Sequence, residues 1–196
     1  MIRSIIMAAV LVCGGAAAQT TPEDISADLS ARNERIITAL NADKQSGALS
    51  SESALALIQK EMSPIIDYRR LSSSATGKHW RKANDVQKDE IIKAFRAVLE
   101  KTYAKVLARY TEQQSRIVDV KERADKTIVV NSEIYGTRGN AKMDYVFAQK
   151  DGKALIIDMQ VEGISLISAY RRQFNQIAKK AGIDGLVAKL RELADK

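Results

Sequence analysis

The chain has 196 residues and a formal charge of +7, which favours one domain with a core of its own. Its only histidine is His79 and its only cysteine is Cys13, so the residues do not provide a zinc site or an internal disulfide. The basic charge suits contact with anionic membranes or acidic partner surfaces.

Residues 1–18 have the three-part layout of a secretory signal peptide. Arg3 precedes an apolar run that ends at Val12, and small residues follow up to Ala18, after which we expect cleavage. The run is too short to span a bilayer as a helix, and the alternatives are an uncleaved anchor or a buried helix. A lipoprotein would use Cys13, but Val12 stands where that processing usually has a small residue.

Removal of this segment leaves a mature chain with a charge of +6, because Arg3 is its only charged residue. The mature chain also lacks cysteine, so it needs neither a disulfide nor a thiol in an oxidising compartment. We expect no nucleic-acid partner, because the basic residues are spread along the chain and an exported protein lies outside the cytoplasm.

Helical spacing of apolar residues dominates the first half of the mature chain. It predicts a helix over residues 22–41, a second capped by Ser50 and running to residue 62, and two short helices after Pro64 that are broken near Gly77.

A long helix is predicted over residues 86–113, with Asn84 and Gln87 as a capping box. Its apolar stripe is wider than one surface helix needs, which indicates burial on more than one side or a helix that walls a cavity. The stripe comprises Ile91, Ile92, Phe95, Val98, Leu99, Tyr103, Val106, Leu107 and Tyr110.

The hydrophobic period changes at Ser115, and four strands are predicted, over residues 115–125, 126–138, 140–149 and 153–162. Turn signals separate the later strands at hairpin spacing, which favours an antiparallel meander. The alternation places Ala141, Met143, Tyr145 and Phe147 on one face of the third strand, and Leu155, Ile157, Met159 and Val161 on one face of the fourth.

Helical patterns return over residues 164–181 and 183–194, with Gly182 as a helix stop. Helices, then a meander, then helices predict an α+β fold in a single domain over residues 19–196. No internal repeat or low-complexity linker divides it.

Signals for catalysis are weak. His79 lies in a basic stretch typical of a surface, and the Gly163–Ser165 pair lacks the second glycine of a nucleophile elbow, so Ser165 fits a helix start better. Asp67 and Asp158 lie in apolar neighbourhoods, where each is either a general base or a paired or capping carboxylate. No phosphate-cradling glycine loop or dinucleotide fingerprint is present.

Three motifs in the second half carry a family resemblance. They are "DMQVEGISL" over residues 158–166, "YRRQF" over residues 170–174 and "GIDGL" over residues 182–186. With the helical region over residues 64–110, they resemble the periplasmic phospholipid-carrier family of the Mla pathway, also known as the toluene-tolerance Ttg family. The resemblance covers nearly all of the mature chain.

The resemblance implies a periplasmic carrier that shuttles phospholipid between the outer and inner membranes and maintains outer-membrane lipid asymmetry. It implies a helical layer on a curved antiparallel four-stranded sheet, enclosing an apolar cavity for acyl chains, with no cofactor and no enzymatic activity. The implied partners are an inner-membrane ABC lipid transporter complex and an outer-membrane lipoprotein–porin complex. We expect transient contact with membrane surfaces and a monomeric carrier.

Apolar residues on the long helix, on the sheet face and after the last strand are the candidates for contact with acyl chains, although ordinary core is the alternative for each. Aliphatic and methionine side chains prevail among them, and such side chains adapt to flexible cargo. The candidates are Val98, Tyr103, Val106, Leu107, Ile128, Val130, Ile134, Met143, Tyr145, Phe147, Ile157, Met159, Val161, Leu166, Tyr170 and Phe174.

Arg171 and Arg172 are candidates for headgroup or partner contact, because guanidinium groups pair well with phosphate. Three other functions remain open at this point. The chain could carry another lipid such as a hopanoid, act as an adaptor without cargo, or be an enzyme that uses Asp158 in an apolar pocket.

Overall fold

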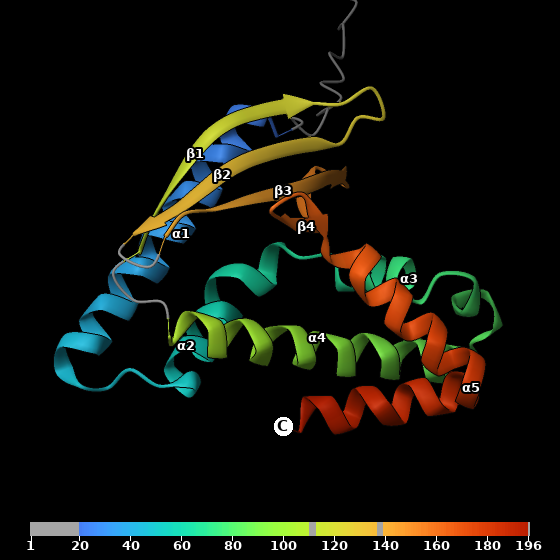
Figure 1. Cartoon of the computed structure of the whole chain (residues 1–196). Helices are drawn as coiled ribbons and strands as arrows, with labels where there is room; N and C mark the ends of the chain where they lie inside the picture. The colour runs from blue at the N-terminus through green and yellow to red at the C-terminus, as the bar shows by residue number, and fades with distance from the viewer. Residues whose placement is uncertain (1–19, 110–112, 137–138, 196) are drawn as a thin grey trace, which may run out of the picture.

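The computed structural model describes residues 20–109, 113–136 and 139–195, and helices precede and follow a block of strands (Figure 1). The signal-peptide prediction for residues 1–18 lies outside this range. The helices are α1 (Pro22–Ser46), α2 (Ser51–Leu57), α3 (Tyr68–Thr76), α4 (Asp85–Leu107) and α5 (Leu166–Ala194), with a π-helical turn at Ile58–Met62 and 3-10 turns at Ser63–Ile65 and Gly77–Lys82.

The strands form one antiparallel sheet in which sequence neighbours are also spatial neighbours. They are β1 (Gln113–Glu122), β2 (Ile128–Gly136), β3 (Ala141–Lys150), β4 (Lys153–Val161) and β5 (Ile164–Ser165), in that order across the sheet. The predicted α+β class and meander are confirmed. The sheet has five strands rather than four, because Ile164 pairs with Val161 and Ser165 pairs with Gln160 before α5 begins.

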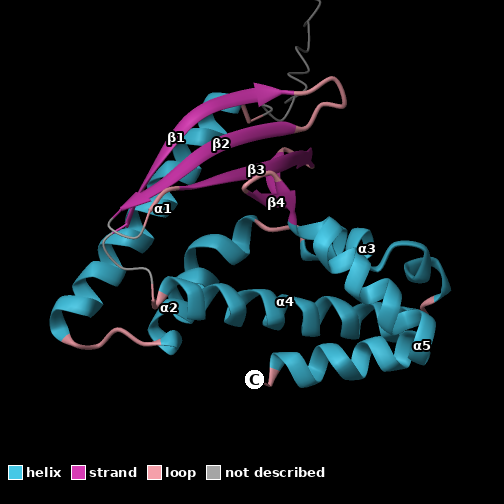
Figure 2. Cartoon of the chain, viewed as in Figure 1, coloured by secondary structure: helices cyan, strands magenta, loops and turns pink. Residues whose placement is uncertain are grey.

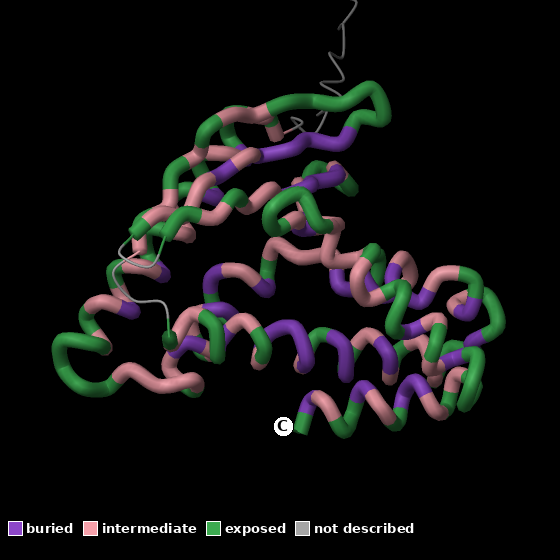
Figure 3. The backbone as a smooth tube through the Cα atoms, viewed as in Figure 1, coloured by how far each residue is buried: buried purple, intermediate pink, exposed green. Residues whose placement is uncertain are grey.

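Helices α2 to α5 form a layer separate from the sheet (Figure 2). α4 and the C-terminal half of α5 lie side by side, while α1 lies against the sheet (Figure 1). Many residues of α4 and of the sheet are buried, whereas the residues that connect β1 and β2 are largely exposed (Figure 3).

The helix ends follow local capping chemistry. The Asn84 side chain accepts a hydrogen bond from the Gln87 N–H at 2.8 Å, and the Gln87 side-chain oxygen accepts one from the Asn84 N–H at 3.0 Å, which confirms the predicted capping box of α4. Ser50 caps α2 by accepting from the Ser53 N–H at 3.1 Å, also as predicted. α1 ends at Ser46 rather than near residue 41. Gly47, the next residue, adopts a left-handed conformation.

The predicted end of the long helix was wrong. α4 ends at Leu107, and Gln113 already pairs with Gly136 in the sheet. The apolar spacing of Leu107 and Tyr110 suits a helix, but pairing with β2 places the chain in a strand from Gln113 onward. Tyr110 itself lies outside the described ranges.

Gly182 separates α5 into two helical parts, as the sequence predicted. Its backbone has φ 70° and ψ −170°, a combination open only to glycine. The chain turns there, and Leu186, Val187 and Leu190 are buried in the core that α5 shares with α4.

Candidate functional site

One face of the sheet is covered by an apolar group of side chains that we call the sheet cluster. α1 supplies two of its buried members and the strands supply the rest: Ile25, Leu29, Ile128, Val130, Tyr145, Phe147, Ile156 and Met159. Because α1 lies across this face, residues near the start of the mature chain pack against strands more than a hundred positions later.

A second apolar group, the helix cluster, lies between α4 and α5. Phe95 packs edge-on against Tyr170 and Phe174, with ring centroids 4.8 and 5.0 Å apart. Its buried members are Tyr68, Ala75, Ile91, Ala94, Phe95, Val98, Leu99, Phe174, Leu186, Val187, Leu190 and Ala194.

The two clusters meet at a small set of side chains. Tyr103 of α4, Leu166 at the start of α5 and Ile66 before α3 pack against both of them. Tyr103 also contacts a third group, formed by Ile36, Leu40, Ala54, Ile58 and Ala104 around α1 and α2. The apolar interior is therefore continuous from the sheet to the helical layer.

The hydroxyls of Tyr103 and Tyr145 lie within this interior. Burial raises the pKa of Tyr103 and of Tyr145 to about 12, so both phenols are neutral at physiological pH. A hydrogen bond from Asn33 of α1 partly opposes the shift at Tyr145. These hydroxyls are uncharged polar groups within the mainly apolar interior.

Most of the sequence-predicted candidates lie in this interior. Tyr103 and Leu166 lie at the junction of the two clusters. The candidates that belong to the sheet cluster or pack on it are Ile128, Val130, Met143, Tyr145, Phe147 and Met159. Those that belong to the helix cluster or pack on it are Val98, Tyr170 and Phe174. Leu107 packs on the third group. Contact of these residues with lipid stays a prediction.

Four candidates lie elsewhere. Val106 and Val161 are exposed, and half-buried Ile134 belongs to none of the three groups. The fourth candidate, Ile157, is also in none of them. The sequence placed Leu155 and Ile157 on the same face of β4 as Met159, and this prediction was wrong. A bulge shifts the pairing of β3 with β4 between Val146 and Phe147.

The bulge brings Ile156 opposite Phe147 in the sheet cluster and turns Ile157 to the other face of the sheet. Sequence reasoning therefore missed Ile156, whose strand has no glycine or proline to mark the bulge. It also left out Ile25 and Leu29, although their helical spacing was visible.

The face of the sheet turned away from the sheet cluster borders an open pocket of about 340 Å³, which we call the outer pocket. It is lined by Arg70, Ser74, Arg123, Asp125, Thr127, Val146, Ile157, Asp158, Gln160, Ser165, Ile167, Ser168 and Arg171. A second pocket, of about 370 Å³, lies where α1 begins beside the β3–β4 connection, and Ile25 and Phe147 form part of its wall.

The two candidate arginines lie differently. Arg171 lines the outer pocket, and its Nε donates to the Ser74 carbonyl at 2.8 Å. Arg172 is exposed and does not line that pocket.

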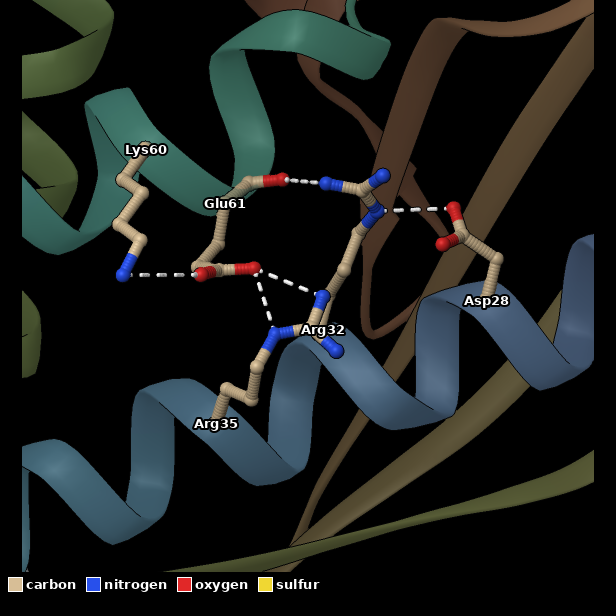
Figure 4. A network of polar contacts seen from close by, with 5 residues as sticks. All are labelled: Asp28, Arg32, Arg35, Lys60 and Glu61. Atoms are coloured by element: carbon tan, nitrogen blue, oxygen red, sulfur yellow. Dashed lines mark hydrogen bonds and ion pairs between the residues drawn. The ribbon is translucent and has the colours of Figure 1, made fainter.

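A group of ionic side chains joins α1 to the π-helical turn (Figure 4). The Glu61 carboxylate accepts from Arg35 at 2.8 Å, and Arg32 donates to the Glu61 carbonyl at 2.6 Å while pairing with Asp28. The hydrogen bond from Arg35 lowers the pKa of Glu61 despite its burial. This group, the Glu61 network, ties the helix that covers the sheet to the helical layer.

The catalytic candidates have structural partners. Asp158 accepts from Ser165 Oγ at 2.6 Å and from the Ile167 N–H at 3.2 Å, and Ser165 caps α5 as predicted. Asp67 caps α3 by accepting from the Arg70 N–H at 2.8 Å. His79 is buried rather than on the surface and lies 3.1 Å from the Asn175 side-chain oxygen.

Over the described ranges, no three or more His, Cys, Asp or Glu side chains are grouped so that they could hold a metal ion. Within the same ranges, no helix is both long enough and apolar enough to span a membrane.

Comparisons with known proteins agree on one family. The model of the family described as MlaC protein matches residues 31–192. The intermembrane phospholipid transport system binding protein MlaC of Haemophilus influenzae is 22% identical over 198 residues, covering 98% of this chain and 91% of its own.

A solved structure has the same fold. It is the phospholipid-binding protein of Ralstonia solanacearum in complex with a phospholipid, which matches with a TM-score of 0.78 and 23% identity. The match covers 91% of this chain and 98% of that one.

Proposed function

The chain belongs to the MlaC protein family, and on that premise we propose that it is a periplasmic phospholipid carrier. It holds acyl chains in its apolar interior and shuttles lipid between the outer and inner membranes, so that the lipid asymmetry of the outer membrane is maintained. Its Haemophilus relative is an intermembrane phospholipid transport binding protein, and the Ralstonia protein of the same fold binds a phospholipid.

The observation that carries this proposal is the continuous apolar interior between the sheet and the helices. An acyl chain resists leaving a bilayer at about 0.8 kcal/mol per CH₂, so a chain of about sixteen carbons costs on the order of 13 kcal/mol. A few polar contacts do not offset that cost, and a carrier must supply comparable apolar surroundings. The sheet and helix clusters, joined at Tyr103 and Leu166, are such surroundings.

The acyl chains lie between the two clusters, beside Leu166. Aliphatic and methionine side chains that belong to the sheet cluster or pack on it, among them Met62, Met143 and Met159, adapt to a flexible chain. The hydroxyls of Tyr103 and Tyr145 are neutral, so an acyl chain beside them does not displace water from a charged group.

The proposed location and partners rest on the same family membership. The signal peptide directs export and is cleaved after Ala18, and the mature carrier is a basic monomer that makes transient contact with membrane surfaces. It exchanges lipid with an inner-membrane ABC transporter complex and an outer-membrane lipoprotein–porin complex. It acts by binding, without catalysis.

Mass spectrometry of an organic extract tests the proposal. The mature protein is purified without detergent after expression with its signal peptide, and we expect stoichiometric phospholipid. An empty extract from folded protein would favour the adaptor function instead, and a hopanoid or other lipid would be recognised by its mass.

A pair of variants tests where the chains lie. Leu166→Trp fills the junction of the two clusters and is expected to lower the lipid content several-fold. Val86→Trp adds the same side chain at a position that is 69% exposed, and is expected to retain the normal content. Equal lipid content in both variants would place the acyl chains elsewhere.

A further inference from the structure

The outer pocket brings three arginines from different parts of the chain to one place. Arg70 comes from α3, Arg123 from the β1–β2 connection and Arg171 from the first turns of α5. Ser168, which carries a hydroxyl group, also lines the pocket. The pocket therefore combines charged and neutral hydrogen-bond donors.

The two carboxylates in the pocket are already engaged. Asp158 accepts three hydrogen bonds, from Ser165 Oγ and the N–H groups of Met159 and Ile167. Asp125 accepts from the hydroxyl and the N–H of Thr127, at 2.6 and 3.0 Å. Both carboxylates fix local backbone and do not pair directly with the arginines.

The guanidinium groups, in contrast, retain donors. Arg171 uses its Nε for the Ser74 carbonyl, which orients the side chain and leaves its two terminal nitrogens directed elsewhere. Among the described residues, no carboxylate lies within 4.0 Å of a guanidinium nitrogen of Arg70, Arg123 or Arg171; Arg123 acts on Asp125 only at longer range.

We propose that the outer pocket is a binding site for a phosphate group, held by Arg70, Arg123 and Arg171. Guanidinium groups match phosphate oxygens in geometry and charge. The volume of about 340 Å³ suits a small anionic group.

The position of the pocket links it to the proposed function. Ile167 lines the outer pocket and Leu166, the preceding residue, lies at the junction of the apolar clusters. A phospholipid with its chains beside Leu166 thus has a phosphate site next to it; this step rests on the proposed carrier function. The same chemistry also suits a free phosphate, and the experiment separates the two sources.

The test uses the lipid-stripped mature chain and inorganic phosphate, with chloride at equal ionic strength as the reference. Phosphate is expected to raise Tm by about 3–6 °C at ten times its Kd. The double variant Arg70→Gln with Arg123→Gln should lose this shift, whereas Arg172→Gln should keep it, since Arg172 is a neighbouring exposed arginine outside the pocket.

Two results would overturn the proposal: no specific shift in the unmodified chain, or an equal shift in the double variant. Because both substituted side chains are exposed, folding should be retained. The titration of the unmodified chain against chloride tests the site even without a variant.

The same titration on protein loaded with phosphatidylethanolamine identifies the source. Loss of the shift means that the headgroup phosphate fills the pocket, and a shift that persists means that the pocket takes a free phosphate. Lipid content, measured by mass spectrometry in each preparation, reports separately on the carrier function, so failure of one proposal is not mistaken for failure of the other.

Discussion

Glu100 is a buried carboxylate on the edge of the helix cluster, only 5% exposed. It accepts hydrogen bonds from Ser63 Oγ at 2.5 Å, Arg96 Nε at 2.7 Å and Gln59 Nε2 at 3.0 Å. Burial alone would raise its pKa, but these hydrogen bonds outweigh burial and hold the pKa below its ordinary value of 4.5. One carboxylate thus ties α4 to the turns that precede α3.

Acid should weaken the fold through this group. Because the folded-state pKa is depressed, the ionised Glu100 stabilises the protein above pH 4.5, and this contribution is lost as the pH falls from 4.5 through the folded-state pKa. We expect Glu100→Gln to be less stable at neutral pH and to lose less stability in acid. Free energies of unfolding in urea over this pH range check it, with the exposed Glu34→Gln as control; parallel pH profiles would contradict the prediction.

Two arginine–glutamate pairs differ mainly in the burial of the carboxylate. The Glu61 side chain is 7% exposed beside Arg35, whereas Glu133 is 30% exposed beside Arg116. Arg35→Ala leaves a nearly buried carboxylate without its strongest partner and should clearly lower the free energy of unfolding. Arg116→Ala removes a surface pair and should lower the free energy of unfolding by less than Arg35→Ala does. Chemical denaturation measures both, and equal costs would show that burial of Glu61 is unimportant.

At the scale of elements, the sequence was most informative where chemistry is local. The capping box at Asn84 and the helix break at Gly182 were predicted because each depends on a few adjacent residues. The bulge in β4 was not, since it depends on how Val146 and Phe147 pair with a neighbouring strand. The end of α4 was missed for the same reason, because pairing with β2 decides where β1 begins.

Gly182 permits the kink on which the packing of α5 depends. Its conformation, φ 70° and ψ −170°, is costly for any residue with a Cβ. Gly182→Ala should therefore destabilise the protein by about 1–3 kcal/mol. Gly47→Ala is the matched control, because φ 75° and ψ 10° lie in the left-handed helical region that other residues tolerate better. Denaturation midpoints rank the two, and a larger cost at Gly47 would refute this account of the kink.

At the scale of the whole molecule, the α+β class followed from the order of hydrophobic periods along the chain. The assignment of residues to clusters did not, because Tyr170 and Phe174 pack on Phe95 while nearby Leu166 also reaches the sheet. The placement of α1 on the sheet has no local signal either. The candidate list was therefore better at finding interior residues than at saying which layer each one joins.

Because the interior is shared by both layers, bound lipid should stabilise the whole molecule rather than one part. A ligand that binds only the folded state at 100 times its Kd adds about 2.7 kcal/mol, which for a chain of this size raises Tm by about 5–11 °C. Calorimetry of lipid-loaded and lipid-stripped protein should show one transition that moves as a unit. In Leu166→Trp the difference between the two preparations should shrink, whereas in Val86→Trp it should persist. If loading shifted only part of the unfolding transition, the lipid would contact one layer alone, and the junction at Tyr103 and Leu166 would not be where the acyl chains lie.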